Sequence, residues 1–397
     1  MGEFFFNPMD PEFVADPYPT YHRLRAEDPV HKSPLGFWVL TRYEDVVAVL
    51  RDHRFAKEAI AAFVAQKLGV ETMAGIGISM LDRDPPDHTR LRSLVSKAFT
   101  PRVVDGLRPR IQEIVDGLLD RAEDRHAMDV IEDFAYPIPV IVICEMLGVP
   151  VDDHERFRGW SLDLARGLDA AMLGPQSEVA LRSMTARRAL ADYFRELIAE
   201  RRNAPRADLL SALITAEEAG DKLSEHELLA TCILLLVAGH ETTVNLLGNG
   251  TLALLRHPSE LRRLRENPGM IGGAVEELLR FDGPVQRTAR IPSVDAVIAG
   301  HKIEAGEMVM PFIGAADRDP AHFPDPDRLD LARADNRHVA FGMGIHFCLG
   351  APLARLEGQL AINALVRRFP KLTLATDRPE YRQSLTLRGL TSLPVAF

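Results

Sequence analysis

Cys348 lies in a segment, residues 341–350, whose glycines and flanking residues suggest metal chemistry. The glycines allow the backbone to bend tightly and to approach a flat ligand, and Gly350 leaves the space behind the sulfur open. A predicted helix begins at Pro352 and runs to Arg368, so its N-terminal dipole favours the thiolate form of the cysteine. A lone thiolate in such a turn suits one axial position of a metal macrocycle better than a tetrahedral zinc site, which needs four ligands. A buried structural cysteine is the alternative interpretation.

A second motif, residues 238–243 with the sequence AGHETT, lies in the middle of the longest predicted helix. Glycine followed by hydroxyl side chains can loosen the helical hydrogen-bond ladder, and a local gap could hold dioxygen and water. His240 and Glu241 also begin an HExxH zinc-protease pattern, but Val244 stands where the second histidine is required. The zinc-protease interpretation is therefore excluded, and an ordinary packed helix remains the alternative.

The cysteine segment resembles the haem-binding signature of the cytochrome P450 superfamily at six positions, namely Phe341, Gly342, Gly344, His346, Cys348 and Gly350. The resemblance implies that the chain binds haem b (iron protoporphyrin IX) noncovalently, with Cys348 as the thiolate ligand of the iron. It also implies that Phe341 shields the sulfur and that His346 reaches a haem propionate.

The same resemblance assigns further residues. It implies that Ala238 and Gly239 lie against the cofactor, and that Glu241 and Thr242 form a catalytic acid–alcohol pair. Buried propionates need cations or donors, and the residues matching the family pattern are His88, Arg92 and Arg290. The expected substrate pocket includes Leu234, Val237, Ala238 and Val285. Glu277 and Arg280, one helical turn apart, are expected to be buried and clamped by Arg328 in a structural role.

Helical patterns dominate the rest of the chain. A capping box at Thr41 and Glu44 predicts a helix to about residue 52, after a hairpin around residues 34–36. A second helix is predicted from residue 101 to about 118, and a box at Ser224 and Glu227 opens one that reaches Arg256, about 45–50 Å long. Strand patterns occur at residues 285–290, 296–298, 308–312 and 384–397. The sequence therefore predicts a mainly α protein with small β-sheets, and the resemblance implies the P450 fold, a helical triangular prism with a long central helix over the haem, as one domain over residues 1–397.

Composition narrows the classes of function. With 46% hydrophobic and 26% charged residues the chain is typical of a globular protein, and its net charge of -10 argues against a nucleic-acid or anionic-membrane surface. Apolar runs fall short of the roughly 18 residues of a bilayer span, and the N-terminus lacks the pattern of a signal peptide. We therefore expect a cytoplasmic protein without a membrane anchor.

The expected activity is that of a monooxygenase, which inserts one oxygen atom of O2 into a C–H bond by hydroxylation or epoxidation. The expected substrate is a lipophilic small molecule, such as a polyketide or macrolide, terpenoid, steroid or fatty acid, bound by apolar segments at residues 55–78, 160–173, 234–238, 285–288 and 387–390. Electrons would come from NAD(P)H through an external ferredoxin or flavodoxin and its reductase. We expect the donor to dock on the basic stretch 88–110, which includes Arg102 and Arg110.

Two other functions remain open at this stage. A peroxide-driven peroxygenase would not need Glu241 and Thr242, which are both present. A non-catalytic haem-binding partner of another enzyme would commonly lose the cysteine or the acid–alcohol pair.

Overall fold

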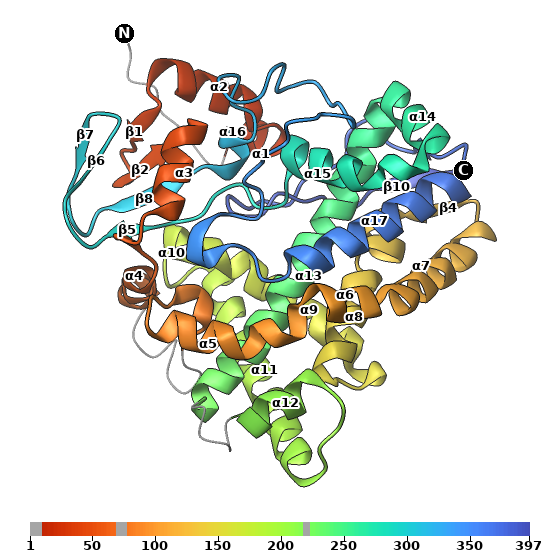
Figure 1. Ribbon diagram of the computed structural model, residues 1–397, viewed down its shortest axis with the longest axis horizontal. Helices are drawn as coiled ribbons and strands as arrows, with labels where there is room; N and C mark the ends of the chain where they lie inside the picture. The colour runs from red at the N-terminus through yellow and green to blue at the C-terminus, as the bar shows by residue number, and fades with distance from the viewer. Residues whose placement is uncertain (1–9, 69–77, 217–222) are drawn as a thin grey trace. The chain divides into compact units, whose positions relative to one another are not determined.

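The computed structural model describes residues 10–68, 78–216 and 223–397 (Figure 1). Parts of the N-terminal segment and of the expected apolar wall 55–78 lie outside these ranges. Contacts divide the chain into two compact units: unit 1 comprises Met1–Ala56, Arg108–Ala135 and Thr242–Phe397, and unit 2 comprises Lys57–Leu107 and Tyr136–Glu241. Because the units are built from alternating stretches of sequence, no single cut along the chain separates them.

Short strands form the β-structure of unit 1. Strands β1 (Val30–Lys32) and β2 (Phe37–Leu40) make an antiparallel hairpin, and β2 pairs in parallel with β8 (Met308–Pro311). The remaining strands are β3 (Phe55–Ala56) with β5 (Ile291–Pro292), β6 (Ala296–Ile298) with β7 (His301–Ile303), and β10 (Pro394–Ala396) between β4 (Ala127–Asp129) and β9 (Thr373–Leu374). The predicted hairpin around residues 34–36 is confirmed by β1 and β2, and the strand patterns are confirmed at residues 296–298 and 308–311. Within residues 384–397 the strand is β10, at 394–396, while residues 285–290 pair only through single bridges.

Helices of unit 1 surround these sheets. They are α1 (Pro11–Ala15), α2 (Tyr18–Glu27), α3 (Tyr43–Arg51), α7 (Arg108–Glu123), the π-helix η4 (Val130–Ala135), α14 (Pro258–Glu266), α15 (Ile271–Asp282), α16 (Ile313–Ala316) and α17 (Ala351–Arg368). Helix α17 packs against α7 and α15 (Figure 1), and a buried apolar cluster joins α3 to the strand β8 and to Val339, just before the cysteine segment.

Unit 2 is helical in its described part. Its elements are α4 (Glu58–Leu68), η2 (Met80–Asp82), α5 (Asp87–Ser96), η3 (Lys97–Phe99), α6 (Pro101–Gly106), α8 (Pro137–Leu147), η5 (Val151–Asp153), α9 (His154–Arg166), η6 (Gly167–Asp169), α10 (Ala170–Leu173), α11 (Glu178–Asn203) and α12 (Leu209–Ala216). Helices α9 and α11 pack along each other, with Phe157 edge-on to Tyr193.

Helix α13 runs without interruption from Glu225 to Arg256, and its first half belongs to unit 2 and its second half to unit 1. The predicted capping box is confirmed, because the Ser224 N–H donates to a Glu227 carboxylate oxygen at 2.8 Å and the Glu227 N–H to the Ser224 hydroxyl at 3.3 Å. This helix is long and apolar enough to cross a bilayer, but 67% of its most apolar stretch is buried inside the protein, as in a core helix.

Two predicted helix features are wrong in detail. Thr41 does not cap α3, which has Arg42 at its N-cap; Thr41 is buried and directs its hydroxyl to the Pro29 carbonyl instead. The helix predicted over residues 101–118 is two helices, α6 and α7, separated at Leu107. In both places the tertiary position of the backbone overrides the local pattern.

Candidate active site

The segment before Cys348 folds into a tight turn that fixes the sulfur. The Cys348 N–H donates to the Phe341 carbonyl at 2.9 Å, which closes the loop on itself. Gly342 and Gly344 have φ angles of +68° and +70°, in the left-handed region that favours glycine. A Cβ at Gly344 would also lie 2.6 Å from the Leu50 carbonyl oxygen, so a side chain there would displace α3 or the loop. The two glycines are therefore required by the turn, as the sequence predicted.

Cys348 is placed directly before helix α17. Gly350 is the N-cap of this helix, and the Ala351 N–H points to the Cys348 carbonyl at 3.4 Å. Cys348 is partly exposed, and a Cβ added at Gly350 would meet no described atom within 4 Å. A partly exposed sulfur beside a helix N-terminus and open space fits an iron ligand beneath a flat macrocycle. Among the described residues, no group of three or more His, Cys, Asp or Glu side chains is arranged to hold a metal ion.

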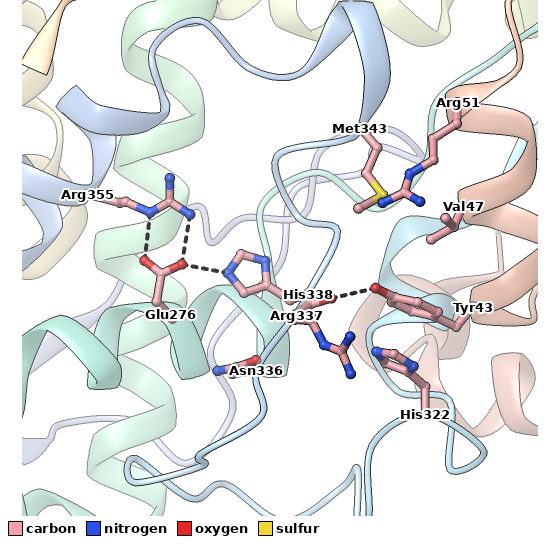
Figure 2. A pocket seen from close by; sticks show the side chains of 10 residues that line it. All are labelled: Tyr43, Val47, Arg51, Glu276, His322, Asn336, Arg337, His338, Met343 and Arg355. Atoms are coloured by element: carbon pink, nitrogen blue, oxygen red, sulfur yellow. Dashed lines mark hydrogen bonds and ion pairs between the residues drawn. The ribbon is translucent and has the colours of Figure 1, made fainter.

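A cavity of about 430 Å³ in unit 1, lined mainly by polar and charged residues and by Met343 of this loop, lies beside the loop (Figure 2). Figure 2 shows Arg51 beside Met343 on one side, and Glu276 between Arg355 and His338 on the other. The Arg355 guanidinium donates to both Glu276 oxygens at 2.7 and 2.8 Å, and His338 Nε2 lies 3.0 Å from Oε2. Burial alone would raise the pKa of Glu276, but these two partners lower it to about 2.

These ionic contacts hold the start of the cysteine loop. Arg355 also places its guanidinium 4.5 Å from the centre of the Phe341 ring, a cation–π contact that fixes the ring beside the loop. The Tyr43 hydroxyl donates to the Arg337 carbonyl at 2.7 Å, as Figure 2 shows. Glu276 and Arg355 could not be paired from the sequence, because they are separated by 79 positions and neither belongs to a recognisable local motif.

Glu277 and Arg280 form the expected buried pair. Both side chains are fully buried, and the Arg280 guanidinium donates to both Glu277 oxygens at 2.8 Å. The prediction that Arg328 clamps this pair is wrong: its side chain is 66% exposed and reaches Asp330. Arg333 is the clamp, with Nε 3.1 and 3.2 Å from the two Glu277 oxygens. Arg328 contributes only its backbone carbonyl, because the turn at 325–328 directs its side chain outward.

Candidate propionate ligands occur in each of the two units. In unit 1, Arg290 is buried and donates to the Thr288 hydroxyl at 3.1 Å and the Ala289 carbonyl at 2.8 Å. In unit 2, His88 and Arg92 lie one turn apart on α5, and His88 is 3% exposed. Burial, and then the Arg92 charge, lower the pKa of His88, so the imidazole is neutral at neutral pH.

Residues of helix α13 in and around the second motif differ in how deeply they are buried. Ala238 is exposed, and Leu234, Val237 and Thr242 are partly buried, whereas His240 and Glu241 are buried. The spacing of three and four residues places the less buried positions on one helical face. Gly239 allows α8 to approach, since a Cβ there would lie 3.1 Å from Ile143. The predicted loosening of the ladder is not seen, because the helix is continuous through residues 238–243.

A further acid next to this motif was not identified from the sequence. Glu357 of α17 is fully buried, and burial raises its pKa to about 8 against a smaller opposing effect of the Thr243 hydroxyl. Its neighbours along α17, Leu353, Leu356 and Ala361, are also buried. A glutamate on the apolar face of a predicted helix is the signal that could have revealed it.

The turn, Cys348 and the start of α17 together form the kind of site expected of a haem-thiolate protein. The family model for cytochrome P450 matches residues 30–395 of the chain. The polyketide biosynthesis cytochrome P450 PksS of Bacillus subtilis (strain 168) is 43% identical over 100% of this chain and 99% of its own length. Vitamin D(3) 25-hydroxylase of Pseudonocardia autotrophica is 45% identical over 96% and 94% of the two chains.

Solved structures support the same family assignment. The structure of P450BioI in complex with acyl carrier protein carrying hexadec-9Z-enoic acid superposes with a TM-score of 0.91, at 42% identity over 97% of this chain and 99% of that one. The chain belongs to the cytochrome P450 family. It has the P450 fold, it is a haem-binding oxidoreductase of the monooxygenase type, and such enzymes act on lipophilic substrates with O2 and redox partners.

Proposed function

We propose that this enzyme hydroxylates or epoxidises a lipophilic small molecule, of the polyketide or macrolide, terpenoid, steroid or fatty-acid class, in the cytoplasm. The observation that carries the proposal is the less buried apolar face of α13, formed by Leu234, Val237 and Ala238, which leads to the partly buried Thr242. An apolar wall that leads to an alcohol suits the binding of a C–H group beside a source of protons.

Haem, held by Cys348, supplies the activation of dioxygen. The chain's own residues would bind the substrate, pass protons and hold the propionates. Leu234, Val237 and Ala238 would contact the substrate and exclude water from it. The Thr242 hydroxyl would hold and pass protons that Glu241 provides. In unit 1, Arg290 and His346 would supply donors or positive charge to a propionate. In unit 2, His88 and Arg92 have the side chains for the same role.

The relatives support a lipophilic substrate without naming it. At 42–45% identity, their names refer to polyketide biosynthesis, to vitamin D(3) and to a carrier-bound fatty acyl chain. Similar identity to proteins with such different ligands indicates that the pocket side chains, and not the fold, decide the substrate. We propose electron delivery by ferredoxin or flavodoxin with its reductase.

A binding-spectrum screen tests the proposal. The ferric holoenzyme is titrated with a lipophilic library that includes free fatty acids, carrier-bound acyl chains, macrolides, terpenoids and steroids. We expect one class to shift the Soret band by displacing iron-bound water, and the same compound to yield an oxygenated product with NAD(P)H, redoxin and reductase. Turnover with peroxide alone, and none with the redoxin, would instead support a peroxygenase.

Replacing Thr242 tests the proton role. Thr242→Ala should still bind substrate and accept electrons but lower the product formed per NAD(P)H several-fold, with peroxide released instead, because the hydroxyl that would pass protons is lost. Thr242→Ser keeps the hydroxyl and should retain most of the coupling. Equal coupling in the alanine and serine variants would contradict the assignment.

A further inference from the structure

We infer that Arg388 is a positioning residue for substrate binding in unit 1. It fixes the pairing between residues 284–286 and residues 386–388, which we call the paired segments. By doing so it sets where the apolar side chains of Val285 and Leu387 contact the substrate. The inference rests on the proposed function, because it assigns these two side chains to the surface that binds a lipophilic molecule.

The paired segments form a short antiparallel ladder. The N–H groups of Gln286 and Arg388 donate to carbonyls of the opposite segment at 2.9 and 2.7 Å. Val285 lies opposite Leu387 between these bonds, as a non-hydrogen-bonded pair whose side chains share one face. Both are partly buried, and Val285 packs in part against the apolar cluster around α3 and β8. The ladder therefore fixes Leu387 next to a residue that the core already holds in place.

Arg388 lies on the other face of the ladder, because neighbouring side chains of an extended segment alternate between faces. Its side chain is buried, and the guanidinium donates at 2.6 Å to Oδ1 of Asp282, the last residue of α15. It also donates to the carbonyls of Val14 and Ala15, at the end of α1, at 2.9 and 3.0 Å. One guanidinium therefore joins a paired segment to α15 and to a helix whose residue Val14 is 374 positions away in the sequence.

The carboxylate that Arg388 binds is held from a second side. The Tyr18 hydroxyl donates to the same oxygen of Asp282 at 2.7 Å. Burial, and then the Asp282 charge, raise the pKa of Tyr18, so the hydroxyl keeps the proton that it donates. The centre of the Tyr381 ring lies 3.8 Å from the guanidinium carbon. A planar donor group with a carboxylate, two carbonyls and a ring around it has one favourable position, so Arg388 acts as a rigid link.

Helix α13 holds the backbone of the same network. The buried Asn249 amide donates to the carbonyls of Arg388 and Asp282 at 3.0 and 3.1 Å. Asn249 lies about two turns after Thr242, roughly 10 Å along the helix axis. The network around Arg388 is therefore fastened to the helix that carries the proposed proton-transfer residue.

The contact with α13 continues at Gly389. A Cβ at Gly389 would lie 1.8 Å from Oδ1 of Asn245, so the chain after Arg388 runs directly against the helix. Asn245 lies about one turn after Thr242. A shift of the paired segments would therefore change the protein surface close to Thr242.

The first test measures the pairing without turnover. Arg388→Lys keeps the positive charge beside Asp282 but loses the planar group that spans the carboxylate and both carbonyls. Hydrogen–deuterium exchange of the ferric holoenzyme should be several-fold faster in peptides covering residues 284–288 and 385–390. Arg265→Lys is the matched control, because the Arg265 guanidinium also donates to two carbonyls, those of Val366 and Phe369, at 2.9 and 3.0 Å. Wild-type exchange of both peptides in Arg388→Lys would overturn the inference.

The second test measures what the pairing does for binding. Imidazole coordinates iron and is too small to need an apolar wall, whereas 1-dodecylimidazole adds a long apolar tail to the same group. In titrations followed by the Soret band, Arg388→Lys should leave the Kd of imidazole unchanged and raise that of 1-dodecylimidazole several-fold. Arg265→Lys should change neither value. A purely structural role would lower haem content or stability but keep the wild-type ratio of the two Kd values in the loaded enzyme, and that result would contradict positioning.

The two hypotheses fail in distinguishable ways. A wild type that gains no affinity from the dodecyl tail and oxygenates no tested compound would refute the proposed function. Oxygenated product, together with a wild-type ratio of Kd values in Arg388→Lys, would refute the role of Arg388 and leave the proposed function intact.

Tyr18→Phe is the second variant, used if Arg388→Lys does not show the thiolate-type carbon monoxide spectrum. It removes one hydrogen bond to Asp282 and leaves the guanidinium in place. Both readouts should then change in the same direction by a smaller factor, and wild-type values of both would count against the inference.

Discussion

Cysteine reactivity in this protein depends on where each thiol lies. Burial raises the pKa values of Cys144 and Cys232 to about 12, so both remain protonated thiols in the interior. Cys348 differs because it is partly exposed and stands at the N-terminal end of α17. Two cysteines are therefore inert thiols in the interior, whereas the turn of residues 341–350 places Cys348 where it can be a thiolate ligand.

Replacement of Cys348 should remove the thiolate signature. We expect purified protein to carry noncovalent haem b and its reduced carbon monoxide complex to show the red-shifted Soret band of a thiolate ligand. Cys348→Ala or Cys348→His should abolish the band because no sulfur reaches the iron. Cys144→Ser is the matched control and should retain it. A Cys348 variant that keeps the band would contradict the ligand assignment.

Replacement of Glu357 should stabilise the protein in a pH-dependent manner. In the folded chain its carboxyl keeps a proton up to about pH 8, whereas in the unfolded chain it loses the proton near the ordinary pKa of 4.5. Folding therefore takes up a proton between these values, and this group lowers the free energy of unfolding as pH rises from about 4.5 to about 8.

Glu357→Gln removes this proton uptake. Since one pKa unit corresponds to roughly 1.4 kcal/mol, we expect the variant to be more stable than wild type by about 3 kcal/mol at pH 7 and nearly unchanged close to pH 4.5. Denaturant unfolding at several pH values measures the difference. A stability difference that does not change with pH would show that Glu357 is ionised in the folded protein.

At the scale of elements, charged pairs fasten the segments around the cysteine turn. Helix α15 contributes two adjacent acids with separate roles: Glu276 binds Arg355 of α17, and Glu277 binds Arg280 and Arg333. The Asp330 N–H also donates to Glu277 at 3.0 Å. One turn of a helix therefore fixes both α17 and the loop of residues 325–336.

Arg333 and Arg328 provide a direct comparison. Arg333→Ala should destabilise the protein by about 3 kcal/mol, because it leaves part of a buried carboxylate uncompensated. Arg328→Ala removes an exposed contact with Asp330 and should change stability by about 0.5 kcal/mol or less. Haem content and denaturant unfolding of the two variants measure the effect. Equal effects would contradict the assignment of Arg333 as the clamp.

At the scale of the whole molecule, an acidic chain carries a local reversal of charge at residues 88–110. Some of these cations already have acidic partners in the chain, which weakens their attraction for a redox partner. Arg90 pairs with Asp87 and Glu227, and Arg110 lies 2.8 Å from Glu113. Lys97 and Arg102 are exposed. We propose that this stretch steers an acidic ferredoxin, with Arg102 contributing more than Arg110.

Charge reversal tests this docking hypothesis. Arg102→Glu should raise the apparent KM for ferredoxin several-fold at low salt and less at high salt, because salt screens exposed charges, and Arg110→Glu should have a smaller effect. Arg195→Glu, at a position on α11 whose side chain is 40% exposed, is the control. Substrate affinity should be unchanged in all three variants. Reduction rates equal to wild type at low ionic strength would show that the donor docks elsewhere.

The sequence alone predicted the features that depend on residues close together along the chain, namely the cysteine turn and the central helix. The cysteine turn was predictable because glycines with positive φ, a thiol and a helix start all lie within a dozen residues, 341–352. The capping box at Ser224 and the apolar length of α13 likewise predicted the central helix. The residues of the AGHETT motif were recognisable for the same reason, although their contacts were not.

Tertiary structure alone decided which distant side chains meet. Arg333 and Arg328 are both arginines of one loop, and only the fold of that loop turns one toward Glu277 and the other toward solvent. Similarly, the pKa of Glu357 depends on burial, and the contact of His240 Nε2 with Glu241 depends on rotamers within a packed helix. Such pairings require no special backbone conformation and produce no recognisable residue pattern in the sequence. The packing of the folded chain therefore determines them.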